Sequence, residues 1–385
     1  MLGLGRVVAP LREYSWFQVL DDRRLALRDR IYASARFQRG AASFLPTRLI
    51  ARRRAHDLFD LCAGFVYSQI LAACVELGIF DLLLDEPRDL RALACHCGLS
   101  TDATTRLLDA AVSLRLLQRR SRGRYGLGPL GASIAKNPGL AGMIAHHRHL
   151  YADLIDPVSL MRRSGSPTEL GKYWPYAAAR QPGDLSSEDV ASYSALMTSS
   201  QPLVADEVLD AYPLDGHRCL LDVGGGEGAF LAEAAARFPD LRLMLFDLPA
   251  VAERARAFLS MRGLTGRSQT FGGDFFRDSL PKGADVISLI RIALDHDDQK
   301  VLVLLRAARA ALDEGGVLLV AEPLQHVGHE PIASAYFEFY LMAMGRGRVR
   351  TREEFTTLLT RAGFKKVQFR KGRRVLQTGI AIATA

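Results

Sequence analysis

Cysteine and tryptophan are scarce in this chain, whose 385 residues include only five cysteines and two tryptophans. The cysteines are odd in number and scattered, which argues against the even, closely spaced set of a disulfide-rich secreted domain. Cys95 and Cys97 flank His96 too tightly for a zinc knuckle, and no other cysteine pair lies nearby. We therefore expect reduced thiols, no metal site and a cytoplasmic protein.

Long uninterrupted apolar runs are also absent. The N-terminus has no continuous apolar core of the kind found in a signal peptide. The most apolar region, residues 58–84, is interrupted by Asp60, Glu76 and Asp81. Its charge-free part, residues 61–75, is too short to span a bilayer. We predict that this region forms buried helices in the interface of a homodimer.

Positive charge is concentrated at one end of an otherwise ordinary soluble composition, which is 49% hydrophobic and 24% charged. Residues 1–60 contain twelve arginines against six acidic residues, which accounts for most of the net charge of +8. Such a segment suits an anionic membrane surface or a nucleic acid, and an arm of solvated helices is an equally good interpretation. Helical patterns near Ser15–Leu27 and Arg28–Phe37 precede a break expected at Pro46.

Residues 85–136 have the order of elements of a winged helix. They comprise a helix at 89–97, a turn in which Ser100 or Thr101 is the N-cap, a helix at 102–116 and a hairpin at 119–127. Near the start of the second helix, where a DNA-binding protein would read bases, only Thr104, Thr105 and Arg106 are suitable. We therefore expect a dimerisation module and no nucleic-acid partner.

Residues 137–215 are helical and rich in aromatic side chains, and they contain a histidine group, His146, His147 and His149. Only Asp153 stands at ligand spacing from this group. We therefore expect these histidines in the core or in the wall of a pocket.

The rest of the chain alternates apolar strands with helical patterns, which is typical of a doubly wound α/β domain. The strands are expected at 217–223, 241–247, 267–273, 284–291, 315–322, 365–371 and 375–383. We divide the chain into a basic helical arm at 1–55, a winged-helix dimerisation domain with a helical linker at 56–185, and the α/β domain at 186–385.

A glycine turn at 220–230, Leu-Leu-Asp-Val-Gly-Gly-Gly-Glu-Gly-Ala-Phe, joins the first of these strands to a helix. The residues that permit positive φ and a close approach of a ligand are Gly224, Gly226 and Gly228. Gly224, Gly226 and Ala229 also fit the dinucleotide fingerprint. However, the carboxylates of Asp222 and Glu227 would repel a diphosphate, and they suit a ligand that carries an ammonium and a sulfonium.

Two further strand ends carry groups for the same ligand. Asp247, about 20 residues after the turn, is placed for a ribose diol. Asp274 and Phe275 suit an adenine amino group and ring face. We therefore predict a site for S-adenosylmethionine, in preference to a dinucleotide or to a turn without a ligand. Its expected residues are Asp222, Gly224, Gly226, Asp247, Leu248, Asp274, Phe275 and Arg291.

Six motifs occur in the order found in one enzyme family: the glycine turn, Asp247-Leu-Pro, Gly273-Asp-Phe, Arg291…Asp295…Asp298, Gly315-Gly…Ala321-Glu-Pro and Arg350-Thr-Arg-Glu-Glu-Phe355. Across residues 55–385 the chain resembles S-adenosylmethionine-dependent O-methyltransferases of the caffeate/hydroxyindole class. Within this class it is similar to the carotenoid branch of purple phototrophic bacteria, for example in Lys172-Tyr-Trp-Pro-Tyr176.

The resemblance implies a Rossmann-like class I methyltransferase domain with a winged-helix dimerisation domain, assembled as a homodimer. It also implies methylation of the tertiary C-1 hydroxyl of an acyclic carotenoid, of the demethylspheroidene or hydroxyneurosporene type. A protein of this kind is cytoplasmic or peripheral to the inner photosynthetic membrane. Because a carotenoid resides in the membrane, the basic arm would serve to bind the enzyme to the membrane surface that holds its substrate.

The family's general base is missing from its usual position. Leu294 stands where the family has histidine, and His296 stands at the tryptophan position that follows. One family glutamate is kept as Glu322, and the second is replaced by Val349. His296 is therefore the candidate base, with Glu322 orienting it or contacting the substrate. An exposed turn beside a capped helix, with no protein base, is the alternative.

An apolar pocket is expected for the acceptor. Its candidate residues, for which core packing is the alternative role, are Met197, Phe337, Tyr340 and Met344. Two other functions stay open. One is methylation of another pigment or of a phenol, and the other is a non-catalytic S-adenosylmethionine-binding regulator that uses the winged helix on DNA.

Overall fold

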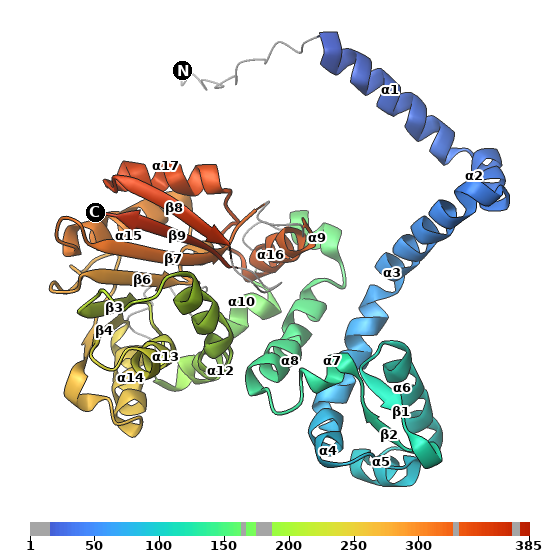
Figure 1. Cartoon of the computed structure of the whole chain (residues 1–385), viewed down its shortest axis with the longest axis horizontal. Helices are drawn as coiled ribbons and strands as arrows, with labels where there is room; N and C mark the ends of the chain where they lie inside the picture. The colour runs from blue at the N-terminus through green and yellow to red at the C-terminus, as the bar shows by residue number, and fades with distance from the viewer. Residues whose placement is uncertain (1–15, 163–166, 175–186, 326–330, 372–377) are drawn as a thin grey trace. The chain divides into compact units, whose positions relative to one another are not determined.

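A computed structural model describes residues 16–162, 167–174, 187–325, 331–371 and 378–385. The chain divides into two compact units, residues 1–71 and 72–385. The described part of the first unit consists of α1 (Trp16–Ala33), α2 (Ala35–Ser43) and most of α3 (Leu45–Glu76) (Figure 1).

The arm is helical, as the sequence predicts, but Pro46 does not break it. The chain leaves the helical conformation at Phe44, with φ −80° and ψ 119°. Pro46 lies in the first turn of α3, where the missing N–H costs no hydrogen bond. The expected break therefore lies two residues earlier, and α3 continues without interruption past residue 55.

The helix α3 exposes large apolar side chains, including Leu61 at 81% and Phe65 at 72% exposure. The charge-free run at 61–75 is shorter than a bilayer span. The whole helix, however, is long and apolar enough to cross a membrane, and very little of its apolar part is buried inside the structure. A helix that packs against a second copy of the chain can have the same length and composition, so these two features do not distinguish a membrane span from a dimer interface.

The winged-helix elements form as predicted. They are α4 (Ile79–Asp85), α5 (Leu90–Cys97), α6 (Thr101–Ser113) and the antiparallel pair β1 (Leu117–Arg119) and β2 (Tyr125–Leu127). Ser100 caps α6, because its side chain accepts a hydrogen bond from the backbone N–H of Ala103. Thr104 is buried, and Arg106 is paired with Asp102. Of the three side chains considered for reading bases, Thr104 is therefore inaccessible, while Arg106 lies at the surface in an ion pair within the helix.

A group of helices follows: α7 (Pro129–Ala132), α8 (Pro138–Asp153), α9 (Pro157–Arg162), α10 (Glu169–Tyr173) and α12 (Ser187–Ala211). The histidine group lies on α8. His146 and His147 place Nε2 at 3.0 Å and 2.6 Å from the hydroxyls of Tyr340 and Tyr336. Their expected place in the core is confirmed.

A seven-stranded sheet follows the helices. Its strands are β3 (Cys219–Val223), β4 (Arg242–Asp247), β5 (Ser268–Gly272), β6 (Val286–Ile290), β7 (Val317–Pro323), β8 (Lys366–Lys371) and β9 (Thr378–Thr384). They lie in the order β5-β4-β3-β6-β7-β9-β8. The first five strands are parallel, and β9 runs antiparallel to both β7 and β8. The predicted doubly wound α/β fold is confirmed, within a few residues at each strand end.

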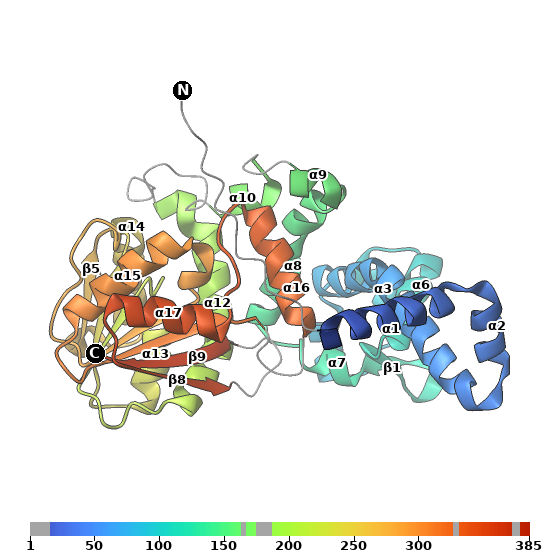
Figure 2. The same cartoon turned by 90° about the horizontal axis from the view of Figure 1, so that it is seen from above.

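Helices cover both faces of the sheet (Figures 1 and 2). On one face, α15 (Asp298–Ala311) and α17 (Arg352–Ala362) pack against Leu221 and its neighbours. On the other face, α12, α13 (Ala229–Arg237) and α14 (Pro249–Met261) pack against Leu220 and its neighbours. The strand order reverses between β3 and β6, and in such sheets ligands bind beyond the carboxyl ends at this point.

Candidate functional site

A cavity of about 440 Å³ lies beyond the carboxyl ends of β3, β4, β5 and β6. Of the residues expected at the cofactor site, it is lined by Gly224, Gly226, Asp247, Leu248, Asp274, Phe275 and Arg291. Cavities of this size hold one drug-sized ligand. The structure thus brings together residues that lie up to 67 positions apart in the sequence.

At two of its positions the glycine turn leaves no space for a side chain, and at Gly226 the constraint is the positive φ of 58° alone. Gly224 has φ 69°, and a Cβ atom there would lie 2.6 Å from Cδ1 of Ile292. A Cβ atom on Gly225 would lie 2.5 Å from the Oδ2 atom of Asp222. Both contacts are too close, so the backbone faces the cavity only because these residues are glycine.

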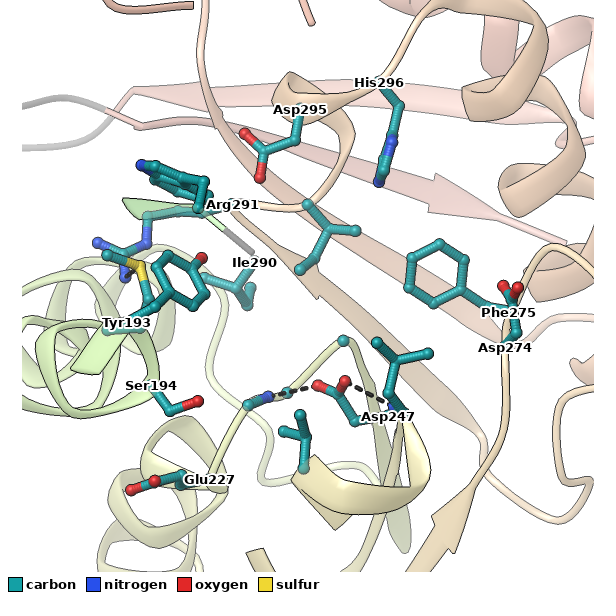
Figure 3. A pocket seen from close by; sticks show the side chains of 18 of the residues that line it. Tyr193, Ser194, Glu227, Asp247, Asp274, Phe275, Ile290, Arg291, Asp295 and His296 are labelled. Carbon is teal, nitrogen blue, oxygen red and sulfur yellow. Dashed lines mark hydrogen bonds between the residues drawn. The ribbon is translucent and has the colours of Figure 1, made fainter. Parts of the chain in front are cut away.

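Asp247 holds the turn from the end of the neighbouring strand. Its Oδ2 atom accepts a hydrogen bond of 2.8 Å from the backbone N–H of Gly226, and its Oδ1 atom accepts one of 2.7 Å from Leu248 (Figure 3). Burial raises the pKa of Asp247 to about 6, although both backbone donors lower it. A carboxylate fixed in this way can also accept hydrogen bonds from the hydroxyls of a ribose.

Asp222 does not line the cavity, contrary to the direct cofactor contact predicted for it. It is 1% exposed, and its Oδ1 atom accepts a hydrogen bond of 2.6 Å from Ser288. Burial raises the pKa of this carboxyl to about 7. The carboxyl supports the turn by contact, because its Oδ2 atom fills the space directly beneath Gly225, while Ser288 on the neighbouring strand β6 holds its Oδ1 atom.

Glu227 also differs from its sequence interpretation. Its side chain pairs with Arg254 at 2.5 Å and accepts a hydrogen bond of 3.0 Å from Thr198. The charge that was expected to repel a diphosphate is therefore compensated. The argument for an S-adenosylmethionine site consequently depends on Asp247, Asp274 and Phe275 more than on Glu227.

Glu322, at the end of β7, does not line the cavity either. It is 2% exposed, and its Oε1 atom accepts hydrogen bonds from the backbone N–H groups of Ile292 at 2.8 Å and Ala293 at 2.6 Å. Burial raises the pKa of Glu322 to about 8. The expected direct contact with a substrate is thus not found, and Glu322 instead holds the start of the 291–298 loop.

Arg350 holds the same loop from another side. The side chain is 1% exposed. It donates hydrogen bonds of 2.8 Å to the carbonyl of Ala293, 2.5 Å to the carbonyl of His296 and 2.9 Å to the carboxylate of Asp298. Because Glu322 and Arg350 bind mainly backbone atoms, they fix the path of the loop without contacting its functional side chains.

His296 lines the cavity and is not part of an exposed turn. Its ring lies edge-on to Phe276 at 4.9 Å and to Phe275 at 6.0 Å. Its Nδ1 atom is buried and has no hydrogen-bond partner among the described residues. Burial, together with nearby cations such as Arg346, lowers the pKa of His296 to about 4. Helix capping is done by Asp297, which accepts from the N–H of Lys300.

Asp295 is a site residue that the sequence-based list omits. It lines the cavity beside His296, and Figure 3 shows both on the side opposite Asp247. Burial raises the pKa of Asp295 to about 7, while Arg291 and Arg346 act to lower it. The sequence contains a signal for Asp295, because it lies between Arg291 and His296, which are both predicted site residues. The nearby start of a helix at Asp298 favours a capping role for Asp295 instead.

The structure places two of the four residues predicted for the acceptor pocket at the cavity. Met197 and Met344 line the cavity, and Phe337 and Tyr340 do not. Tyr340 is 7% exposed and accepts a hydrogen bond of 3.1 Å from Nε1 of Trp174. Phe337 packs against the same buried cluster. Both aromatic rings lie on the core side of α16 (Pro331–Met344), and Trp174 and Tyr193 line the cavity in their place.

Comparisons with known proteins agree with this site. A profile of the O-methyltransferase domain matches residues 174–365, and a profile of the O-methyltransferase dimerisation domain matches residues 59–137. The demethylspheroidene O-methyltransferase of Cereibacter sphaeroides is 44% identical over 90% of this chain and 91% of its own length. That of Rhodobacter capsulatus is 41% identical over 83% of this chain and 79% of its own length.

A solved structure of human N-acetylserotonin methyltransferase in complex with S-adenosylmethionine has a TM-score of 0.71 and is 27% identical. The match covers 86% of this chain and 97% of that protein. S-adenosylmethionine is the cofactor that the site residues suit. Because both profiles match and these relatives are similar over most of their length, the chain belongs to the S-adenosylmethionine-dependent O-methyltransferases that carry an N-terminal dimerisation domain.

Proposed function

We propose that this protein transfers a methyl group from S-adenosylmethionine to the tertiary C-1 hydroxyl of an acyclic carotenoid of the demethylspheroidene or hydroxyneurosporene type. The observation that carries the proposal is the identity of 41–44%, over most of the chain, to two demethylspheroidene O-methyltransferases. S-adenosylmethionine supplies an activated methyl group, and the chain's residues bind and orient both ligands.

We assign the cofactor side of the cavity to the residues after β3, β4 and β5. Asp247 would accept hydrogen bonds from the ribose hydroxyls, and Asp274 and Phe275 would contact the adenine. Gly224 and Gly226 leave room for the backbone to approach the ligand. Leu248 and Arg291 also line the cavity. Asp222 would act indirectly, because it supports the turn.

Both charged and apolar side chains line the acceptor side of the cavity. Met197, Met344 and Trp174 line it, and methionine side chains adapt to irregular ligands. A cavity of about 440 Å³ is small for a cofactor and a complete carotenoid together. We therefore expect the hydroxylated end of the carotenoid to enter the cavity while most of its polyene chain stays outside.

We further propose that the basic arm contacts an anionic membrane surface as one part of a homodimer. Residues 30–56 contain seven arginines and no acidic residue. On the same segment Phe44, Leu45 and Leu49 are exposed at 62%, 76% and 75%. Exposed apolar groups beside a cluster of arginines are typical of segments that lie in the headgroup region. The match to the dimerisation domain supports the homodimer.

Carotenoid methylation is tested with purified protein, S-adenosylmethionine and a hydroxylated acyclic carotenoid in liposomes, with mass spectrometry of the product. We expect one added methyl group on the carotenoid and S-adenosylhomocysteine in equal amount. A phenolic acceptor is assayed in parallel. Turnover of the phenol without turnover of any carotenoid would contradict the proposal.

Membrane contact is tested by sedimentation with phosphatidylglycerol vesicles. Each arginine near an anionic surface contributes about 1 kcal/mol, so replacing Arg52, Arg53 and Arg54 with glutamine should weaken binding roughly 100-fold. The matched control replaces three arginines outside the arm, Arg122, Arg306 and Arg361, and should bind like the wild type. Equal binding of both variants would contradict a membrane role for the arm.

A further inference from the structure

The two positions at which the family keeps its His–Glu pair are both apolar here. Leu294 and Val349 are 8% and 2% exposed and belong to one buried cluster with Tyr340 and Leu341. An apolar contact has therefore replaced the pair as a unit, and neither position offers a group that can take a proton. A tertiary alcohol is a poor acid, so a proton acceptor elsewhere in the cavity is needed.

We propose that Asp295, and not His296, accepts the hydroxyl proton during methyl transfer; this inference rests on the proposed function. Asp295 lines the cavity together with the glycine turn and Asp247, so it faces the volume in which donor and acceptor must meet (Figure 3). The oxygen of the alcohol forms the new bond to the methyl carbon. The carbon–sulfur bond breaks with its electron pair going to sulfur, and the hydroxyl proton goes to the Asp295 carboxylate.

The geometry leaves the carboxylate of Asp295 available while its backbone is fixed. Among the described residues, no hydrogen bond or ion pair engages its side chain. The loop beneath it is held by Glu322 at Ile292 and Ala293, and by Arg350 at Ala293 and His296. A group in a fixed position with unoccupied acceptor sites is what proton transfer in a positioned complex requires.

Basicity also favours Asp295 over its neighbour. Burial raises the pKa of Asp295 to about 7 and lowers the pKa of His296 to about 4. The carboxylate of Asp295 is therefore the stronger base of the two. A base whose pKa lies near the operating pH is the most effective, because it is both deprotonated and basic.

The charged and titratable groups around Asp295 come from several elements. They are Arg291 on its own segment, His296 next to it, Glu322 on β7, Tyr340 on α16 and Arg346 after α16. The two arginines lower the pKa of Asp295, and burial outweighs them. Loss of either arginine should therefore raise the pH at which Asp295 becomes deprotonated.

The main test compares Asp295→Asn with Asp297→Asn. Asp297 is exposed two residues away and caps α15, a role that asparagine fills equally well. We expect Asp295→Asn to lower kcat by about 10²–10⁴-fold, with S-adenosylmethionine affinity and melting temperature retained. Asp297→Asn should keep its turnover. In the wild type kcat should rise with pH through about 7, a limb that Asp295→Asn loses and His296→Gln keeps.

A second measurement does not depend on the acceptor. Carbon-13 NMR of aspartate-labelled protein bound to S-adenosylhomocysteine, with Asp295→Asn used for assignment, should show a carboxyl that titrates near pH 7. An ordinary aspartate pKa of about 4 would overturn the proposal, as would a folded Asp295→Asn enzyme with wild-type turnover. If no carotenoid is methylated by the wild type, the proposed function fails, and the NMR titration still decides on Asp295.

Discussion

Replacing Arg350 with methionine would measure how strongly the 291–298 loop is held. Methionine keeps an unbranched apolar stem and removes the guanidinium, so packing changes little while the hydrogen bonds disappear. Two buried backbone carbonyls, those of Ala293 and His296, lose their donor. The third partner, Asp298, is 44% exposed and remains bound to Arg348, so its loss adds little.

The magnitude follows from these contacts. A hydrogen bond that involves a charged group contributes about 1.5–3 kcal/mol, so two such bonds correspond to about 3–6 kcal/mol. Some recovery is expected, because methionine avoids leaving a charge buried. We therefore expect Arg350→Met to lower the free energy of unfolding by about 2–5 kcal/mol, because each of the two carbonyls left without a donor costs about 1–3 kcal/mol.

Urea denaturation followed by circular dichroism measures this change. The control is Arg348→Met, the same substitution two residues earlier. Arg348 is 39% exposed and pairs with Asp298 and Glu354 at the surface, so its loss should cost less than about 1 kcal/mol. If the two variants differ by less than about 1 kcal/mol, Arg350 does not hold the loop as described. The Arg350→Met enzyme should also methylate more slowly at saturating substrate, because the loop positions Asp295.

Three further outcomes are expected. Asp247→Ala should weaken S-adenosylmethionine binding in calorimetry, since the carboxylate that fixes Gly226 and suits the ribose is lost; tight binding of NADH by the wild type would contradict the site assignment. The ligand-free protein should lose stability as pH rises from about 7 to 8.5, a range in which the raised carboxyls lose their protons and the histidines of the unfolded chain, with a pKa of about 6.5, are already mostly neutral. These carboxyls are Asp222, Asp295 and Glu322, whose pKa values in the folded protein are raised to about 7 to 8. Below these pKa values the protonated carboxyls favour the folded state, and this contribution to the free energy of unfolding is lost above them. A melting temperature that rises over this range would refute the burial argument. Light scattering should show a homodimer, and Leu61→Asp with Phe65→Asp should shift it to monomers, because both side chains are largely exposed on α3.

Much of the fold follows from the sequence because the central strands are short, buried and separated by clear helical patterns. All five residues of β3 and of β6 are buried, so their apolar runs are unmistakable. The glycine turn is equally clear, since positive φ at Gly224 and Gly226 requires glycine. The helix break predicted at Pro46 lies at Phe44 instead. Proline occurs both after the end of a helix and in the first turn of one, and only the backbone geometry at Phe44 separates the two cases.

The site was harder to predict where two residues of one type have different roles. Asp222 and Asp247 both end apolar strands, yet one side chain points under the turn and the other into the cavity. On α16, Tyr340 and Met344 lie one turn apart, and the hydrogen bond from Trp174 draws the tyrosine into the core. Such differences depend on partners more than 60 residues away, which local patterns do not contain.

The way in which the 291–298 loop is held has a consequence for how this family diversifies. Glu322 accepts hydrogen bonds from backbone N–H groups and Arg350 donates to backbone carbonyls, and every residue type except proline supplies both groups. The identity of the side chains at 294–296 can therefore change while the loop keeps its course. A histidine can be lost at one position and a carboxylate recruited at the next without refolding. If Asp295 accepts the proton as proposed, the proton-accepting group of this chain is a replaceable side chain on a loop whose course is fixed independently of it.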